Sequence, residues 1–208
     1  ICASNSNKVL YDFFRTGEYD RNREFVLTTS PSMDILISSN LERLIYHIAG
    51  DSAEADAGFM KKLSEEGKYQ ITDEMRERLG DFAGGYATEE ETAEEIRERY
   101  EKDGYVIDPH TAVASAVYGK YRKETGDATR TVIVSTASPF KFETSVMKAL
   151  GKPHELPDLE LADALSAVSG VAVPQAVAGL RGAEIRHKTV CDKDEKAMAA
   201  EVEKFLGI

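Results

Sequence analysis

The sequence contains few cysteines. Only two cysteines, Cys2 and Cys191, occur in 208 residues, and they stand near opposite ends of the chain. Neither belongs to a Cys-x-x-Cys pair, and no histidine stands at a spacing that would complete a site. We therefore expect no disulfide framework and no metal site, and we interpret both thiols as small apolar groups packed in the reduced state.

Long apolar runs and positive charge are also scarce. No uninterrupted apolar run approaches the roughly 20 residues that a membrane-spanning helix needs, and no basic start leads into an apolar segment. We therefore expect a cytoplasmic setting and no membrane partner. With 26 Lys and Arg against 37 Asp and Glu, the net charge is -11. This balance argues against a nucleic-acid partner, because proteins that bind phosphate backbones concentrate positive charge.

Helical and strand-like patterns alternate along the chain. Apolar spacing predicts helices over residues 8–16, 40–50, 53–66, 73–79, 89–102, 112–121, 140–150, 158–168 and 194–205. Short apolar runs predict a strand that ends near Ala3 and further strands over 24–27, 105–107, 131–135 and 184–189. The run 131–135 is β-branched and continuous, which makes it the clearest strand.

This alternation predicts an α/β fold: a layered parallel or mostly parallel sheet with flanking helices, plus a helical insertion. Residues 1–50 would form part of the α/β domain, 51–104 the helical insertion or subdomain, and 105–208 the remainder of the α/β domain with a C-terminal segment. The many charges of the middle stretch are interpreted as solvated helix faces.

Ligands of open α/β sheets lie beyond the carboxyl ends of strands, and two segments stand at such positions. Residues 3–7 follow the first predicted strand, and residues 136–139 follow the strand 131–135. Either segment by itself is also explained by ordinary caps and turns. His110 stands after a proline at a helix start, where a structural role is the usual one. Lys141 between two phenylalanines has no phosphate-binding loop nearby, so it is weak support for a Schiff base.

Several longer strings resemble threonine synthases, and they occur in the order that this family shows. The strings are LYDFFRTGEYDR (10–21), SPSMDI (30–35), SNLER (39–43), DPHTA (108–112) and STASPFKF (135–142). They span most of the chain up to Phe142. The last string departs from the family form, in which a histidine and an alanine stand where this chain has Ser138 and Phe140.

The resemblance implies a pyridoxal-phosphate enzyme with a fold like that of the tryptophan synthase β chain, and residues 1–50 then belong to its cofactor-binding domain. It implies a reaction that converts O-phospho-L-homoserine and water to L-threonine and phosphate. In that family the lysine that carries the cofactor lies before Ile1, so this chain is expected to be a C-terminal fragment without catalytic residues of its own. The partner expected for it is the missing N-terminal part of the same enzyme, and the isolated chain is expected to be inactive.

The resemblance also implies site residues. Thr136 matches the hydroxyl residue that ends a late strand beside the cofactor ring. A hydroxyl there makes physical sense, because it can donate a hydrogen bond to an unprotonated ring nitrogen. Ser30, Ser32 and Asn40 lie in matched strings and are candidates for substrate binding, although helix capping explains them equally well.

Two other hypotheses remain open at this point. One is a different pyridoxal-phosphate lyase or dehydratase with the same fold. The other is a non-catalytic binding domain that has kept the scaffold. The sequence that precedes Ile1 in the full reading frame would separate all three.

Overall fold

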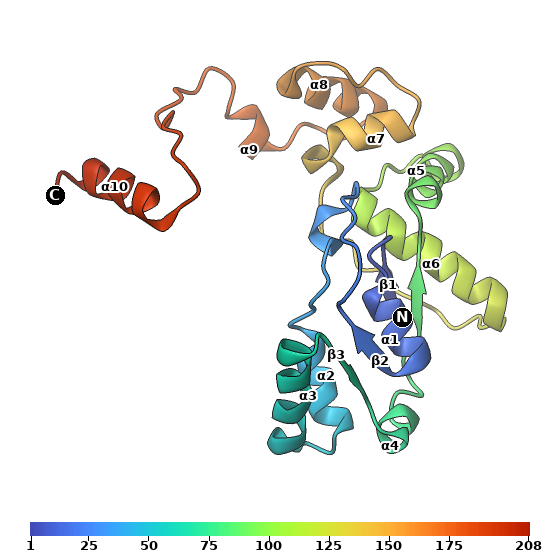
Figure 1. Ribbon diagram of the computed structural model, residues 1–208. Coiled ribbons are helices and arrows are strands. Elements are labelled where there is room, and N and C mark those ends of the chain that lie inside the picture. Colours follow the sequence, from blue (N-terminus) through green and yellow to red (C-terminus); the bar gives the residue numbers. More distant parts are fainter. The chain divides into compact units, whose positions relative to one another are not determined.

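The computed structural model describes residues 1–208, and its chain divides into two compact units, Ile1–Val173 and Pro174–Ile208. The first unit is of the α/β class, with short strands between longer helices (Figure 1). All of the chain's buried residues lie in this first unit. No helix is long and apolar enough to cross a membrane.

A two-stranded parallel sheet lies between two helices of the first unit. Strand β1 (Cys2–Ser4) pairs with β4 (Gly84–Tyr86) in the register Cys2 to Gly84 and Ser4 to Tyr86. A Cβ atom on Gly84 would lie 2.8 Å from Cβ of Phe14, and one on Gly85 would lie 2.4 Å from Cγ1 of Val117. Helices α1 (Val9–Thr16) and α6 (Pro109–Thr125) therefore approach opposite faces of β4 more closely than a side chain would allow.

An antiparallel pair of strands organises the larger apolar core. Strand β2 (Glu18–Asp20) pairs with β3 (Lys68–Gln70), and the rings of Tyr19 and Tyr69, which are cross-strand partners, stack with centroids 5.4 Å apart. The side chains that pack around this pair come from α1, α2 (Leu41–Ile48), α3 (Ala53–Glu65) and α4 (Asp73–Glu77). The buried members of this cluster are Val9, Phe13, Tyr19, Leu41, Ile45, Ile48, Leu63, Tyr69, Ile71, Met75 and Leu79.

Local signals in the sequence account for the helices of the rest of this unit. Helix α5 (Glu89–Asp103) begins at a capping box, in which Thr88 and Glu91 each bind the other's backbone N–H. Helix α6 begins at Asp108, whose side chain accepts the N–H of His110. Two 3₁₀ helices, η1 (Pro31–Met33) and η2 (Pro139–Lys141), each begin with proline, and α7 (Glu143–Ala149) and α8 (Asp158–Ser169) follow the second of them.

The second unit contains α9 (Gln175–Ala178) and α10 (Glu195–Leu206), and neither helix has a buried residue. Between them the chain is irregular and exposed, so the strand predicted over 184–189 does not form. Cys191 is exposed here, contrary to the packed thiol that we expected, whereas Cys2 is half-buried. Burial raises the pKa of the Cys2 thiol above its ordinary value, so this thiol is neutral.

The predicted helices are confirmed, with ends within a few residues of the expected ones, but three further strands are not. Residues 131–135 are irregular, with Val132 84% and Val134 70% exposed, because no strand of this chain lies alongside to pair with them. Residues 105–107 are irregular for the same reason. Residues 24–27 are held differently: the side-chain amide of Asn7 accepts the N–H of Val26 and donates to its carbonyl, at 2.9 and 2.7 Å.

Residues 51–104 are less purely helical than we predicted. They contain β3 and β4, and β4 pairs with β1. The sequence did not predict strand β4, because the pair Gly84-Gly85 has a low strand propensity. The division of the chain at residues 50 and 104 remains a prediction.

Candidate functional site

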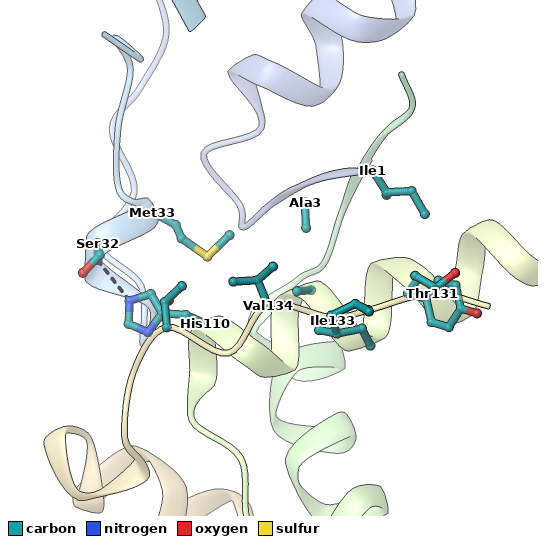
Figure 2. Close-up of a pocket in the computed structure, with 12 residues that line it drawn as sticks. Ile1, Ala3, Ser32, Met33, His110, Thr131, Ile133 and Val134 are labelled. Atoms are coloured by element: carbon teal, nitrogen blue, oxygen red, sulfur yellow. Dashed lines mark hydrogen bonds between the residues drawn. The ribbon is translucent and has the colours of Figure 1, made fainter. Parts of the chain in front are cut away.

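The cavity that contains Thr136 has a volume of about 390 Å³ and is shown in Figure 2. Its walls come from the start of β1, the 3₁₀ helix η1, the first half of α6 and the irregular segment 131–136. The lining residues are Ile1, Ala3, Ser32, Met33, His110, Ala114, Tyr118, Thr131, Val132, Ile133, Val134 and Thr136. None of them is a lysine, aspartate or glutamate. The cavity therefore offers hydroxyl groups and apolar surface, with one imidazole.

His110 joins two walls of this cavity. Its Nδ1 lies 2.9 Å from Oδ1 of Asp108, and its Nε2 accepts the backbone N–H of Ser32 at 3.2 Å, drawn as a dashed line in Figure 2. A ring that accepts at Nε2 is neutral, so its proton lies on Nδ1 and is donated to Asp108. Because both ring nitrogens are engaged, His110 fixes the position of Ser32 and is not a free base. This agrees with the structural role expected from its place at a helix start.

The start of α6 also holds the segment that ends in Thr136. The hydroxyl of Thr111 donates to the carboxylate of Asp108 and lies 3.0 Å from Oγ of Ser135. Thr136 itself is exposed and lines the cavity. Ser135, the residue before Thr136, is thus linked through Thr111 to Asp108, which also orients His110.

Ser30 lies in a buried polar network beside the cavity. Its Oγ accepts a hydrogen bond from Nδ2 of Asn5 at 3.0 Å and lies 3.2 Å from Oγ1 of Thr28. The carboxylate of Asp34 completes the network, because its Oδ1 accepts from Asn5 at 2.8 Å and from Thr28 Oγ1 at 2.7 Å. This network holds residues 28–34 against the carboxyl end of β1.

The structure brings Thr136 and Ser32 to one cavity, but Ser30 and Asn40 do not line it. Asn40 is exposed just before α2, and its side chain accepts a hydrogen bond from Nη2 of Arg43 at 3.0 Å. Sequence reasoning did not find Asn5 and Asp34, the most connected members of the network. The small polar residues at the end of the first strand were the available signal, but nothing in the sequence joins them to Asp34.

The positions where the last string departs from the family form have structural roles here. Oγ of Ser138 accepts the N–H of Phe140 at 3.3 Å at the start of η2, and Phe140 is buried. Lys141 is exposed and does not line the cavity. No group of three or more His, Cys, Asp or Glu side chains is placed to hold a metal ion.

Comparison with known proteins places these features in a family. The family described as "Threonine synthase, C-terminal" matches residues 111–202. "Threonine synthase-like 1" of Macaca fascicularis is 34% identical over 99% of this chain, which spans 28% of that protein's length. The crystal structure of threonine synthase from yeast superposes with a TM-score of 0.80 at 28% identity, over 99% of this chain and 42% of that one.

A second solved structure is that of threonine synthase from Brucella melitensis with bound pyridoxal phosphate. It superposes with a TM-score of 0.67 at 35% identity, over 81% of this chain and 34% of that one. The matched strings, the family match over residues 111–202 and the superposition of nearly the whole chain agree, and this chain belongs to the threonine synthase family.

Proposed function

We propose that this chain is the C-terminal part of a pyridoxal-phosphate-dependent threonine synthase that converts O-phospho-L-homoserine and water to L-threonine and phosphate. The observation that carries the proposal is the Thr136 hydroxyl on a cavity wall without any carboxylate, in a chain of this family. A carboxylate beside a pyridine nitrogen would keep that nitrogen protonated, whereas a hydroxyl can donate to the unprotonated nitrogen.

The residues present fit one side of a pyridoxal phosphate site. Figure 2 places Met33 and Val134 at the same cavity, where their apolar side chains could flank a ring. No lysine lines the cavity, so the covalent anchor and the phosphate-binding loop are proposed to lie in the missing N-terminal part, which would be the partner of this chain. When bound, the cofactor supplies the electron sink that lets protons leave the carbon atoms of the substrate.

The proposed site residues of this chain would then have the following roles. Thr136 would bind the ring nitrogen by donating a hydrogen bond from its hydroxyl group. His110 would keep Ser32 in place at the cavity, and Ser32 would face the substrate; Ser30 and Asn40 remain proposed substrate contacts, although neither lines the cavity. The isolated chain is proposed to be inactive, and the full-length protein is proposed to act in the cytoplasm.

Substitution of Thr136 in the full-length protein tests the proposal. Thr136→Val keeps the shape but removes the donor, which should cost about 1 to 3 kcal/mol and lower turnover by about ten- to a hundredfold. Thr136→Ser keeps the hydroxyl and should be much milder. Turnover is followed as phosphate release from O-phospho-L-homoserine, together with the cofactor absorption spectrum and the melting temperature.

The same assay separates the alternatives. If Thr136→Val keeps full turnover but has a lowered melting temperature, Thr136 has a structural role and does not bind the cofactor. A wild-type protein that binds pyridoxal phosphate but releases no phosphate would favour another lyase or dehydratase. The similarity to relatives named "Threonine synthase-like 1" is the observation that favours testing such a divergent role.

A further inference from the structure

A second cavity, of about 630 Å³, lies between α1, β4 and α6. Its side chains that carry charge or an aromatic ring are Tyr11, Arg15, Tyr86, Lys120, Lys123 and Glu124, together with Tyr121. We call it the basic cavity. It shares only Ile1 with the cavity of Thr136, so it belongs to a different part of the surface.

Positive charge gathers at this cavity although the chain as a whole carries -11. Arg15, Lys120 and Lys123 line it against the single carboxylate of Glu124. Lys120 is paired with Glu91, at 2.6 Å, but no ion pair forms at Arg15 or Lys123. The guanidinium of Arg15 instead donates to the hydroxyl of Tyr11 at 3.0 Å.

Two ammonium groups also share one ring beside the cavity. Nζ of Lys8 lies 4.7 Å and Nζ of Lys120 lies 5.2 Å from the ring centroid of Tyr86. The ring attracts both cations, and the carboxylate of Glu91 already offsets the charge of Lys120. The ammonium group of Lys8 adds further positive charge beside the cavity.

The backbone of β4 adds hydrogen-bond donors to the same cavity. The amide of Cys2 donates to Ala83 at 2.7 Å and that of Ala87 to Ser4 at 3.0 Å, which sets the alternation of the parallel pairing. Gly84 and Tyr86 therefore turn their peptide groups away from β1, toward the free edge. Nζ of Lys120 binds the Tyr86 carbonyl at 2.9 Å, so the N–H groups of Gly84 and Tyr86 remain at this edge together with the Gly84 carbonyl.

We propose that the basic cavity binds a small phosphomonoester, with its phosphate held by Arg15, Lys123 and the edge of β4 and its organic part against Tyr11 and Tyr86. A phosphate dianion matches several converging cations and N–H donors better than a single carboxylate does. The tyrosine rings supply apolar surface for an organic group. The proposal concerns a site apart from the Thr136 cavity and does not rest on the function proposed above.

Calorimetric titration of the full 208-residue chain tests this site with three probes: inorganic phosphate, glycerol phosphate and adenosine monophosphate. We expect saturable binding of at least one ester with a Kd below about 1 mM, weakened by added salt. Amide resonances of Gly84 and Tyr86 should shift in the ¹⁵N-correlated NMR spectrum as that ester is added. Inorganic phosphate should bind more weakly than the ester, because it lacks the organic group.

The variant for this test is the double substitution Arg15→Gln with Lys123→Gln, because both side chains are exposed and neither is in an ion pair. It should raise the Kd of the ester about tenfold or more, in line with the loss of two charged donors. The control Lys61→Gln with Lys62→Gln makes the same charge change on the exposed face of α3 and should leave the Kd within about twofold, since screened surface charges contribute little.

Several results would overturn the proposal. One is the absence of saturable binding of any ester up to about 10 mM, which is too weak for a specific site. Another is an equal loss of affinity in the control, which would assign the effect to net charge. Unshifted amides at Gly84 and Tyr86 would place the ligand elsewhere, and phosphate binding as tight as ester binding would remove the tyrosines from the site.

Discussion

Asp34 accepts four of the hydrogen bonds that hold the loop beside the Thr136 cavity. Its Oδ1 accepts hydrogen bonds from Asn5, Asn7 and Thr28, at 2.8, 3.0 and 2.7 Å, and its Oδ2 accepts the N–H of Thr28 at 3.0 Å. Asn5 and Asn7 are buried, so these donors have little water to turn to. A carboxylate suits this position because it only accepts hydrogen bonds.

The change Asp34→Asn should lower the free energy of unfolding by about 2 to 3 kcal/mol, because an amide group places two donors where the loop already supplies donors. Urea denaturation followed by circular dichroism measures the loss. Asp81→Asn is the matched control, since Asp81 is exposed, and it should have little effect. Equal effects of the two substitutions would mean that the network does not depend on the charge of Asp34.

Close backbone approach defines the contact between β4 and α6 at the scale of elements. Gly85 stands where a Cβ atom would come within 2.4 Å of Val117, a fully buried residue of α6. This close approach explains why glycine stands in β4, even though glycine is a poor strand former.

Gly85→Ala should destabilise the protein by about 1 to 3 kcal/mol, since α6 or β4 has to move to admit the methyl group. Adding Val117→Ala should recover part of this loss by making room, so the two changes should not be additive. Melting temperatures of the single and double variants measure both effects. In Gly119→Ala, on the same helix, a new Cβ meets nothing within 4 Å, and this variant should be neutral or more stable. A Gly85→Ala protein as stable as Gly119→Ala would contradict the close approach.

The aromatic core of the first unit gives the whole molecule a dependence on alkaline pH. Burial raises the pKa of Tyr69, and the neighbouring Tyr19, Asp56 and Glu42 raise it further. Burial also raises the pKa of Tyr19, although the N–H of Ser38 and the charge of Arg23 oppose the shift. For both phenols the folded state binds the proton more tightly than the unfolded state. Their contribution to stability is therefore fully present below the unfolded pKa of about 10 and is lost as pH rises toward the folded pKa.

Tyr69→Phe should leave stability at pH 7 nearly unchanged and move the alkaline unfolding midpoint to higher pH, because a phenyl ring has no proton to lose. Circular dichroism at 222 nm between about pH 8 and 12, a range that spans the ordinary tyrosine pKa, follows the transition. Tyr105→Phe serves as the control, since Tyr105 is exposed. An alkaline midpoint that does not move in Tyr69→Phe would assign the transition to other groups.

Most helices of the whole molecule were readable from the sequence because a helix closes its hydrogen bonds within one segment. Thr88 with Glu91, and Asp108 before Pro109, are start signals that act over a few residues. Strands were not readable in this way, because a strand needs a neighbour. Residues 131–135 have strand-like composition but no pairing partner in this chain, whereas Gly84-Gly85 has neither composition nor alternation and still pairs with β1.

The candidate site divides along the same line. The strings around Thr136 and Ser32 determined, through their family resemblance, which residues to examine and which chemistry to expect. Only the tertiary structure decided that these two residues share a cavity while Ser30 lies in a buried network and Asn40 lies beside α2. It also decided that both ring nitrogens of His110 are engaged. These contacts join segments up to 78 residues apart. Packing between distant segments cannot be inferred from the sequence of either segment alone.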